Sequence, residues 1–466
     1  MENNQNNVGL KNELHKKDSS FTSKLGFVLA ASGSAVGLGN LWRFPYLTAQ
    51  YGGGMFLLSY ILLAVFFGLT LLMLEIGIGR NTGKSVIGAF AQLSPKFKWF
   101  GYVCVIVPLI IVPYYCVVGG WVLKYGWAFL IGEGGLGTSA AIDTASIFTN
   151  FIASPIEPLI FFLIFAGCTV CVVAFGIQKG IEKMSKILMP ALAIIAVVLM
   201  IYVVCQPGAL EGVGYVLIPD FSDFSFLTVL AALGQLFYSM SIGMCIMITY
   251  GSYMKKDVKI TSSASQIAIF DSAFAIIASL IVIPAIFAFS SNPETVIQSN
   301  GASLMFIQLT NIFHGIPVIG RAIGFIFFVL VFFAAVTSSV SLVESIVAVL
   351  CESGKIKRVQ ACLIVFGAIF VLGTLSSLSF GALDFISIFG KNIFDFFDFF
   401  ANNILLPIVA IMTCIIAGWF METKILHKEI GIDNNKGLVS YFDVIVKYVA
   451  PVCILAILIS GLFITF

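Results

Sequence analysis

The sequence predicts an all-α polytopic membrane protein, with two inverted five-helix repeats and one extra helix, giving 11 transmembrane helices. The first reason is composition, since the 466-residue chain is 59% hydrophobic and 10% charged, with a mean hydropathy of +1.05. Soluble domains of this length do not have such a composition. The second reason is that apolar segments long enough to cross a bilayer recur along the chain. The third is that the first and sixth segments are interrupted in the middle.

Polar or turn-rich stretches separate the apolar segments and set their expected boundaries. The segments cover about residues 25–50, 54–79, 99–131, 156–176, 184–206, 226–254, 264–292, 322–351, 358–377, 392–420 and 440–465. Residues 1–24 are expected to form a cytoplasmic N-terminal tail, and residues 25–466 a single transmembrane domain. Its first repeat covers about 25–206, its second about 226–420, and the extra helix about 440–465.

The basic residues favour one orientation in the membrane. If the N-terminus is cytoplasmic, the 25 Lys and Arg residues all lie in the tail or in cytoplasmic loops, except Arg43, Lys124, Arg321 and Lys391. Because basic residues accumulate on the cytoplasmic side, we expect the N-terminus inside and the C-terminus outside. A cleaved signal peptide is not expected, since the first apolar segment is too long for a signal h-region.

Composition and spacing argue against several other functions. The net charge is only +2, and no basic tract predicts binding to nucleic acid. Cys168 and Cys171 have the spacing of a redox motif, but they lie in an apolar segment without His or charged residues. We therefore interpret them as packing residues. The three histidines fall in polar stretches, and no ligand set for a transition metal is visible.

The first apolar segment contains the motif Gly33-Ser-Ala-Val-Gly-Leu-Gly-Asn-Leu-Trp-Arg-Phe-Pro45. Each glycine weakens a helix by roughly 1 kcal/mol relative to alanine. A broken helix is tolerated in a bilayer only where its freed backbone groups line a cavity enclosed by protein. Freed carbonyls can bind a cation, and helix N-termini can bind a carboxylate. The motif therefore predicts an ion and substrate site rather than a plain anchor.

The sixth segment is interrupted at the corresponding place of the second half, over Tyr238-Ser-Met-Ser-Ile-Gly-Met244. Because each half has an odd number of segments, the second half enters the membrane from the opposite side. Paired broken helices in inverted halves are typical of a transporter site at the membrane midplane. The alternative is that both breaks are glycine-rich packing faces. Hydroxyl or amide side chains at both breaks favour the site.

With these two motifs and Ala334-Ala-Val-Thr-Ser-Ser339 in the eighth segment, nearly the whole chain resembles the neurotransmitter:sodium symporter family. The resemblance implies a LeuT-like fold with helices 1 and 6 broken at the midplane, in a bacterial plasma membrane. It also implies a sodium-coupled symporter that imports hydrophobic or aromatic L-amino acids by alternating access. The alternative is an amino-acid-binding membrane sensor without transport. An intramembrane enzyme using Asp395 and Asp398 is disfavoured, because no nucleophile accompanies them.

The resemblance implies two sodium sites. The first would be formed by Ala35, Asn40, Ser239 and Asp271. The second would be formed by Gly33, Val36, Ala334, Thr337 and Ser338. The substrate carboxylate would complete the first site, so that ion and substrate raise each other's affinity. An isolated Thr-Ser pair more often bonds back to its own helix, but the adjacent broken segment favours sodium binding here.

Asp271 is an acid inside the seventh segment, where a charge is costly and functional by default. It corresponds either to an Asn ligand of the first sodium site or to a position one turn from the family's chloride site. The other chloride-site positions would be Tyr60, Gln235 and Ser239. A carboxylate there would balance the sodium charge, so we expect no requirement for chloride. The plain alternative is a structural pair with a buried amide or hydroxyl.

The resemblance also implies a substrate pocket. Its residues would be Ser34, Ala35, Gly37, Leu38, Gly39, Ile111, Tyr115, Tyr238, Ser239, Ser241, Met244, Ser338 and Leu342. Amine transporters of the family carry Asp at the position of Gly37, whereas amino-acid transporters carry Gly because the substrate brings its own carboxylate. Tyr115 would hold that carboxylate. The uncharged pocket implies an apolar or aromatic side chain, and flexible Met244 suits a large one.

Further positions are implied to open, close or brace the transport path. Arg43 and Asp398 would form the outer gate, and Glu75 would brace the unwound part of the first segment. Gly180 and Pro190 match a pattern by which the fifth segment unwinds. Whether Lys17 pairs with Glu352 on the inside stays open, as do the number of sodium ions and the oligomeric state.

Overall fold

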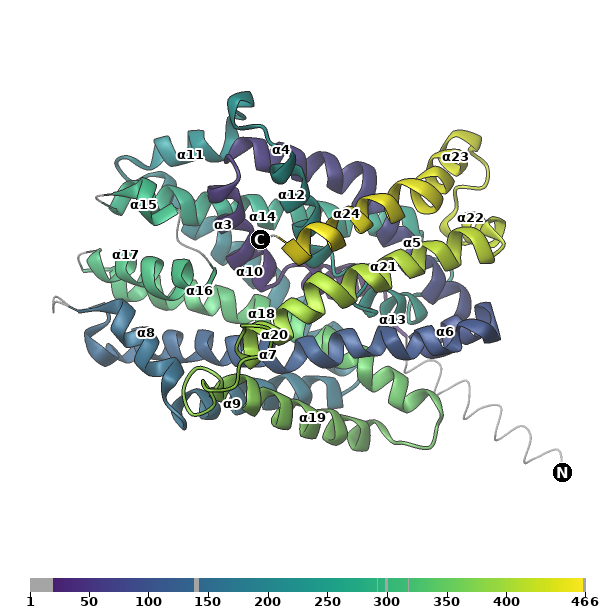
Figure 1. Cartoon of the computed structure of the whole chain (residues 1–466), viewed down its shortest axis with the longest axis horizontal. Coiled ribbons are helices and arrows are strands. Elements are labelled where there is room, and N and C mark those ends of the chain that lie inside the picture. Colours follow the sequence, from purple (N-terminus) through teal and green to yellow (C-terminus); the bar gives the residue numbers. More distant parts are fainter. Residues whose placement is uncertain (1–19, 138–141, 291, 298–300, 317, 464–466) are drawn as a thin grey trace.

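The computed structural model describes residues 20–463, apart from 138–141, 291, 298–300 and 317 (Figure 1). Most of the expected N-terminal tail lies outside the described residues, and so does the possible pair of Lys17 with Glu352.

The first half of the chain contains five membrane-crossing units. They are α2 (Lys24–Ala35) with η1 (Gly39–Arg43) and α3 (Phe44–Gln50); α4 (Gly54–Leu63) with η2 (Ala64–Gly68) and α5 (Leu69–Thr82); α7 (Lys98–Ile131); α9 (Glu157–Ala174); and η5 (Ile177–Glu182) with α10 (Lys183–Val204). Shorter helices connect them, namely α6 (Val86–Leu93), η3 (Pro95–Phe97), η4 (Glu133–Gly135), α8 (Thr144–Ala153) and α11 (Ala209–Leu217).

The second half repeats this plan and adds one unit. Its members are α12 (Phe226–Ser239) with α13 (Ile246–Ser252); α14 (Ile260–Phe289); α18 (Gly320–Glu352); α19 (Arg358–Leu378); α20 (Ile393–Phe399) with η8 (Phe400–Leu405), α21 (Leu406–Ile415) and η9 (Ile416–Phe420); and finally α23 (Lys436–Val444) with η10 (Ile445–Val449) and α24 (Ala450–Phe463). The connectors are η6 (Phe221–Asp223), α15 (Pro293–Ile297), α16 (Gly301–Ser303), η7 (Leu304–Leu309), α17 (Thr310–Gly315) and α22 (Thr423–Ile430).

These units confirm the predicted fold class. Among the described residues, 9 continuous helices are long and apolar enough to cross a membrane, and α2 with the η1–α3 helix makes a tenth span bent by 49°. The remaining span is α12 with α13, whose halves are separately too short to cross. The protein is therefore a multi-pass membrane protein.

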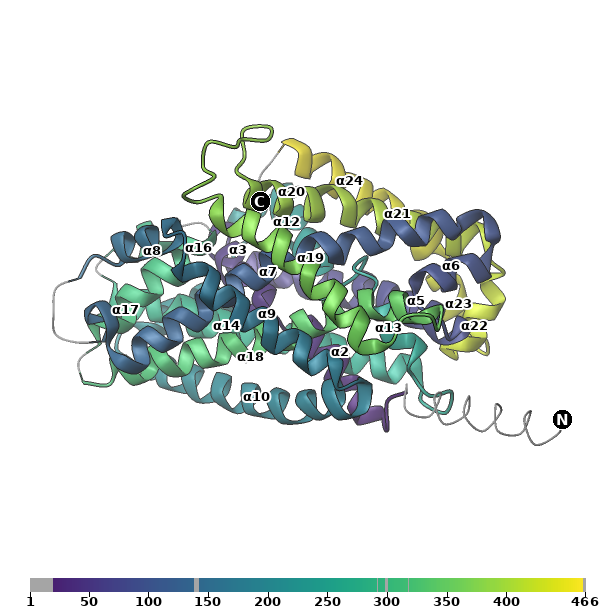
Figure 2. The same cartoon turned by 90° about the horizontal axis from the view of Figure 1, so that it is seen from below.

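The two broken spans lie inside the bundle. The helices run broadly along the long axis of the molecule in both views (Figures 1 and 2). Helix α2 packs against α10, α14 and α18, while α13 packs against α5 and α12 against α4 and η1. Unbroken helices thus surround both breaks, which keeps the freed backbone groups away from lipid.

The breaks have the local conformations that the two motifs predict. Helix α2 ends at Ala35, and Val36 is extended with φ −78° and ψ 93°. In the sixth span Ser241, Gly243 and Cys245 have φ of +55°, +78° and +65°. Positive φ is uncommon for residues with a side chain, so the chain there is held by its surroundings.

The fifth span is helical through Gly180 and Pro190. Gly180 lies in the wide-turn helix η5, and Pro190 lies inside α10. Unwinding of this span stays a prediction about another conformation.

Candidate functional site

A small pocket lies where the two breaks meet α7 and α18. It encloses about 20 Å³. Its lining residues are Ser34, Ala35, Gly37, Leu38, Gly39, Ile111, Tyr115, Tyr238, Ser241, Met244, Ile246, Ser338 and Leu342. Every predicted pocket residue except Ser239 is therefore brought together, and Ile246 was missed. Ile246 is the first residue of α13, and no local pattern indicates where the helix resumes.

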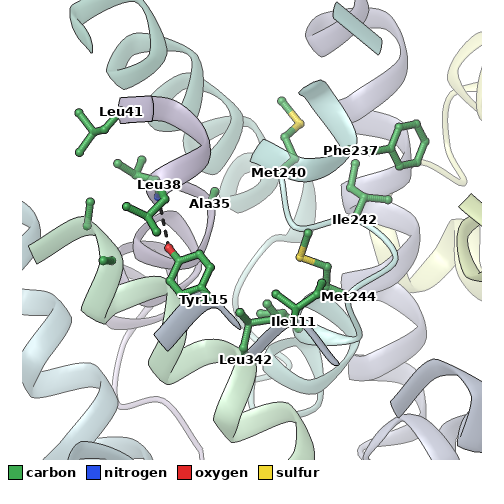
Figure 3. Close-up of a cluster of buried hydrophobic side chains, with 14 of the residues drawn as sticks. Ala35, Leu38, Leu41, Ile111, Tyr115, Phe237, Met240, Ile242, Met244 and Leu342 are labelled. Atoms are coloured by element: carbon green, nitrogen blue, oxygen red, sulfur yellow. Dashed lines mark hydrogen bonds between the residues drawn. The ribbon is translucent and has the colours of Figure 1, made fainter. Parts of the chain in front are cut away.

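One end of the pocket is narrow and polar. The N–H of Leu38 donates to the hydroxyl of Tyr115 at 3.2 Å, as Figure 3 shows. A Cβ atom on Gly37 would lie 2.4 Å from Ser338 Oγ and 3.0 Å from the Tyr115 hydroxyl. Position 37 thus has no room for a side chain in this arrangement.

The other end of the pocket is mostly apolar. Figure 3 shows Ile111, Met244 and Leu342 grouped together, away from Leu38. A hydroxyl pair also reaches the pocket, with Ser34 Oγ 3.2 Å from Ser241 Oγ. Since none of the described lining residues is Asp, Glu, Lys, Arg or His, the pocket suits an uncharged side chain.

A cluster of neutral oxygens lies between α18 and the first break. The hydroxyl of Ser338 is 2.9 Å from the carbonyl oxygen of Ser34, 3.2 Å from that of Gly33 and 3.5 Å from that of Val36. Ser338 thus contacts Gly33 and Val36. Its chain neighbour Thr337 contacts Ala334, with Thr337 Oγ1 3.0 Å from the Ala334 carbonyl. The five residues predicted for the second sodium site are therefore close together. The Thr337 hydroxyl bonds back to its own helix here. Neutral carbonyl and hydroxyl oxygens in an unwound region fit a monovalent cation.

Asp271 joins two groups of residues that the sequence left as alternatives. Its Oδ1 accepts from Asn40 Nδ2 at 2.8 Å and from Ser239 Oγ at 2.5 Å, which are positions of the first sodium site. Its Oδ2 accepts from the Tyr60 hydroxyl at 2.5 Å. The side chain is fully buried. Asp271 therefore contacts residues of both the predicted first sodium site and the predicted chloride site.

Gln235 does not join this group by any hydrogen bond seen in the described residues. Its Nε2 donates to the Gly39 carbonyl at 2.9 Å. Gln235 therefore braces the first break, and only Tyr60 and Ser239 of the predicted anion-site positions bond to Asp271.

Glu75 has a different partner from the predicted one. Its Oε1 accepts from the N–H of Gly243 at 2.7 Å. This carboxyl therefore braces the break in the sixth span, and among the described residues it makes no hydrogen bond to the first span, where its role stays a prediction. The reason is packing, because α5 lies along α13.

A larger cavity of about 290 Å³ lies beyond the pocket, and we call it the vestibule. Its lining includes Leu38, Arg43, Tyr115, Tyr238, Asp395, Asp398 and Asn402, together with Trp42, Trp121, Phe148, Phe380 and Phe394. Leu38, Tyr115 and Tyr238 line both cavities and so separate them. The guanidinium of Arg43 lies over the Tyr238 ring, 5.6 Å from its centroid.

The predicted gate residues both face the vestibule but do not touch. In the described part of the chain, no ion pair links Arg43 to Asp398. Instead Asp398 Oδ1 accepts from Asn402 Nδ2 at 2.8 Å. The vestibule is thus open between the two charges.

The opposite side of the pocket is closed. Phe21 packs on Phe27, Tyr250 and Tyr253 with ring centroids 5.6, 5.5 and 6.3 Å apart. The Tyr253 hydroxyl donates to Glu344 at 2.8 Å, and Arg358 forms an ion pair with the same carboxylate. Arg358 is the first residue of the next helix, α19, so no local pattern in the sequence reveals it as the partner of Glu344.

Known proteins match this arrangement over nearly the whole chain. The sodium:neurotransmitter symporter family matches residues 18–133 and 154–465. The uncharacterized sodium-dependent transporter YhdH of Bacillus subtilis is 33% identical over 96% of this chain and 98% of its own. An uncharacterized sodium-dependent transporter of Haemophilus influenzae is 31% identical over 96% and 99%.

A solved structure is also similar. The crystal structure of MhsT in complex with L-phenylalanine has a TM-score of 0.85 and 37% sequence identity, covering 95% of this chain and 99% of that chain.

Proposed function

This chain belongs to the sodium:neurotransmitter symporter family, whose members are sodium-coupled transporters and not enzymes, and we propose that its cargo is a hydrophobic or aromatic L-amino acid. Sodium and a small-molecule substrate enter as cargo, and the lipid bilayer surrounds the helices. The complex of MhsT with L-phenylalanine supports this class of substrate.

The tight contact at Gly37 is the observation that carries the proposal. A substrate without a carboxylate would need an acid in the pocket to meet its ammonium group, and position 37 has no space for one. An α-amino acid brings its own carboxylate, which can bind the Tyr115 hydroxyl and the N–H groups of the first break. The uncharged lining leaves Lys, Arg, Asp and Glu side chains without partners, at a high desolvation cost.

A bulky side chain requires the pocket to widen. About 20 Å³ is little more than one water occupies. Ile111, Met244 and Leu342 bound the apolar end, and Met244 has the freedom to change its rotamer. We expect substrate to displace these side chains while the Gly37 end stays fixed.

Two sodium ions fit the two oxygen clusters. We assign one to Ala35, Asn40, Ser239 and Asp271, and one to Gly33, Val36, Ala334, Thr337 and Ser338. Asp271 supplies a negative charge beside the first ion, so transport proceeds without chloride. The open vestibule and the closed opposite side correspond to one half of an alternating-access cycle. The distribution of basic residues supports a cytoplasmic N-terminus in a bacterial plasma membrane.

Uptake into proteoliposomes tests the proposal. We expect radiolabelled Phe, Tyr, Trp or Leu to accumulate when sodium is outside, and not when potassium or choline replaces it. Lys, Asp, dopamine and GABA should compete poorly. Equal uptake in all three cation buffers, or preferential uptake of amines, would refute the assignment. Binding without accumulation would favour a sensor instead.

A further inference from the structure

The loop between α19 and α20 has a phenylalanine at an unusual position. Ile388 and Lys391 exchange two backbone hydrogen bonds, of 2.8 and 3.1 Å. The two residues between them, Phe389 and Gly390, have φ of +52° and +78°. Turns with positive φ at both central positions favour Asn-Gly, and a bulky residue there is strained. Packing inside the protein does not offset this strain, because the Phe389 side chain is 91% exposed.

Phe389 is the end of a row of stacked rings, and a second exposed phenylalanine lies in the same loop. Phe385 in the same loop is 77% exposed, more than any of the large apolar side chains exposed on the neighbouring span α19, which range from 39% to 65%. The ring of Phe389 stacks on Phe396 at 6.4 Å, and Phe396 stacks on Phe400 at 5.7 Å. In Figure 2 the loop projects sideways from the bundle, across the direction in which the helices run.

This aromatic row does not point into the vestibule. The vestibule is lined by Asp395, Asp398 and Asn402, which follow a different face of the same helical stretch from Phe396 and Phe400. Phe400 packs against the core of the bundle, and only the end of the row at Phe389 is directed toward the surroundings of the bundle, as the exposed side chains of α19 are.

We propose that Phe385 and Phe389 insert into the lipid leaflet on the vestibule side and anchor the outer-gate helix α20 to the bilayer. Acyl chains stabilise exposed rings that water does not. Lys391 follows the turn, and its ammonium lies 5.1 Å from the Phe399 ring centroid, where an anionic lipid phosphate can reach it. Asn392 then caps α20 by accepting from the Asp395 N–H at 2.8 Å, so the turn sets the position of the helix that carries Asp398.

Spin labelling in liposomes tests the anchor directly. The five cysteines that are not buried (Cys168, Cys171, Cys205, Cys351 and Cys453) are replaced by Ala, and Phe389→Cys is labelled with a nitroxide. We expect frequent collisions with oxygen and protection from a water-soluble nickel complex. Asp384→Cys, exposed in the same loop, is the matched control and should show several-fold greater access to the nickel complex. Phe385→Cys should resemble Phe389→Cys.

Three other outcomes would overturn the proposal. Equal access of nickel to positions 384 and 389 would place the tip in water. Dipolar broadening between labels would instead identify a second copy of the chain as the occupant. The variant Phe389→Asn suits the turn but lacks the ring. If it were combined with labelled Asp384→Cys in phosphatidylglycerol liposomes and changed neither the nickel profile nor sodium-dependent substrate binding, the ring would have no anchoring role.

Discussion

Gly37 is the residue whose size matters most for the proposed pocket. The atoms that a Cβ would meet are the Ser338 and Tyr115 hydroxyls, at 2.4 and 3.0 Å. Both hydroxyls belong to long buried helices, α18 and α7, so neither moves freely. The close approach keeps the backbone of the first break within reach of a substrate carboxylate.

Gly37→Ala should therefore weaken substrate binding. Overpacking a filled site costs about 1–3 kcal/mol, which corresponds to roughly a 5- to 150-fold higher Kd for L-phenylalanine at fixed sodium. Gly167→Ala in α9 is the matched control, because a Cβ there meets nothing within 4 Å. Scintillation proximity binding measures both. Unchanged affinity in Gly37→Ala would show that the pocket is looser than this geometry implies.

Asp271 should make the transporter independent of chloride. Its carboxylate accepts hydrogen bonds from Asn40, Ser239 and Tyr60. With the proposed sodium ion it would form a buried charge pair, and removing one member of such a pair costs about 3–5 kcal/mol. In Asp271→Ser we expect sodium-dependent uptake to be lost in gluconate and to recover in chloride. Wild-type uptake should be equal in both anions.

Asp395→Ser is the control for this experiment, because Asp395 lines the vestibule outside the cluster. Sodium-dependent uptake by this variant should be the same in gluconate and in chloride. Chloride dependence of the wild-type protein would contradict the role given to Asp271.

Local motifs predicted much of this site, and long-range packing decided the rest. The glycine-rich stretch carries the resemblance that implied Ser34, Ala35, Gly37, Leu38 and Gly39, and the structure brings these five residues to one pocket. The partner of Glu75 was not predictable, since two breaks offer unpaired N–H groups and only the packing of α5 on α13 selects Gly243. Thr337 Oγ1 donates to the carbonyls of Phe333 and Ala334 in its own helix, which is common for Thr in a helix.

At the scale of whole elements, α22 ties three parts of the chain together at one end of the bundle. Arg80 at the end of α5 donates to Glu429 Oε1 at 2.7 Å, and Lys256 pairs with the same oxygen at 2.8 Å. Arg80 also donates to the backbone carbonyls of Val258 and Glu429. Partial burial raises the pKa of Glu429, but hydrogen bonds from Lys256 and Arg80 outweigh it and lower that pKa below its usual value.

Glu429→Gln should destabilise the protein by about 1–3 kcal/mol, because Arg80 loses a charged partner. Since the folded state lowers the pKa of Glu429, its contribution is complete above about pH 4.3, the usual value, and is lost as pH falls through the folded pKa. The melting temperature of the wild type should thus exceed that of Glu429→Gln at pH 7 and converge with it below about pH 4. Glu211→Gln, at an exposed acid of α11, should change little. A constant difference across this pH range would contradict the linkage.

Hydropathy predicted where the membrane spans lie, but not where a span departs from regular α-helical geometry. The predicted segment 226–254 corresponds to α12 and α13, and 54–79 to the span from Gly54 to Thr82. Within that second span, η2 widens the helix, and the Tyr441 hydroxyl donates to the carbonyl of Phe66. Tyr441 is 375 residues away in sequence, so no local pattern indicates that this carbonyl has a partner.

For the molecule as a whole, the two ends of the substrate path differ. The Phe21 ring cluster and the Glu344–Arg358 pair close one end, while the vestibule opens at the other. In the proposed alternating-access cycle we expect the reverse arrangement at another stage, with these closing contacts broken and the vestibule collapsed. Arg43 and Asp398 both line this cavity, and we expect them to hold the collapsed state.

The gate can be tested by accessibility from the vestibule side. Closure should bring Arg43 and Asp398 together above bound substrate, since an unpaired cation beside the pocket is costly. Ile111→Cys, below Leu38, Tyr115 and Tyr238, should react with an impermeant thiol reagent in sodium alone. It should react more slowly when sodium and L-phenylalanine are both present. The protection should disappear in the double variant with Asp398→Asn although sodium-dependent binding persists as in Ile111→Cys alone, because Asp398 belongs neither to the proposed pocket nor to the proposed sodium sites. Arg43→Lys keeps the charge and should retain partial protection, whereas Arg43→Ala should lose it and transport slowly.

If substrate protects Ile111→Cys equally in Asp398→Asn, the ligand itself blocks the reagent, and Arg43 and Asp398 are fixed charges of the vestibule rather than its gate.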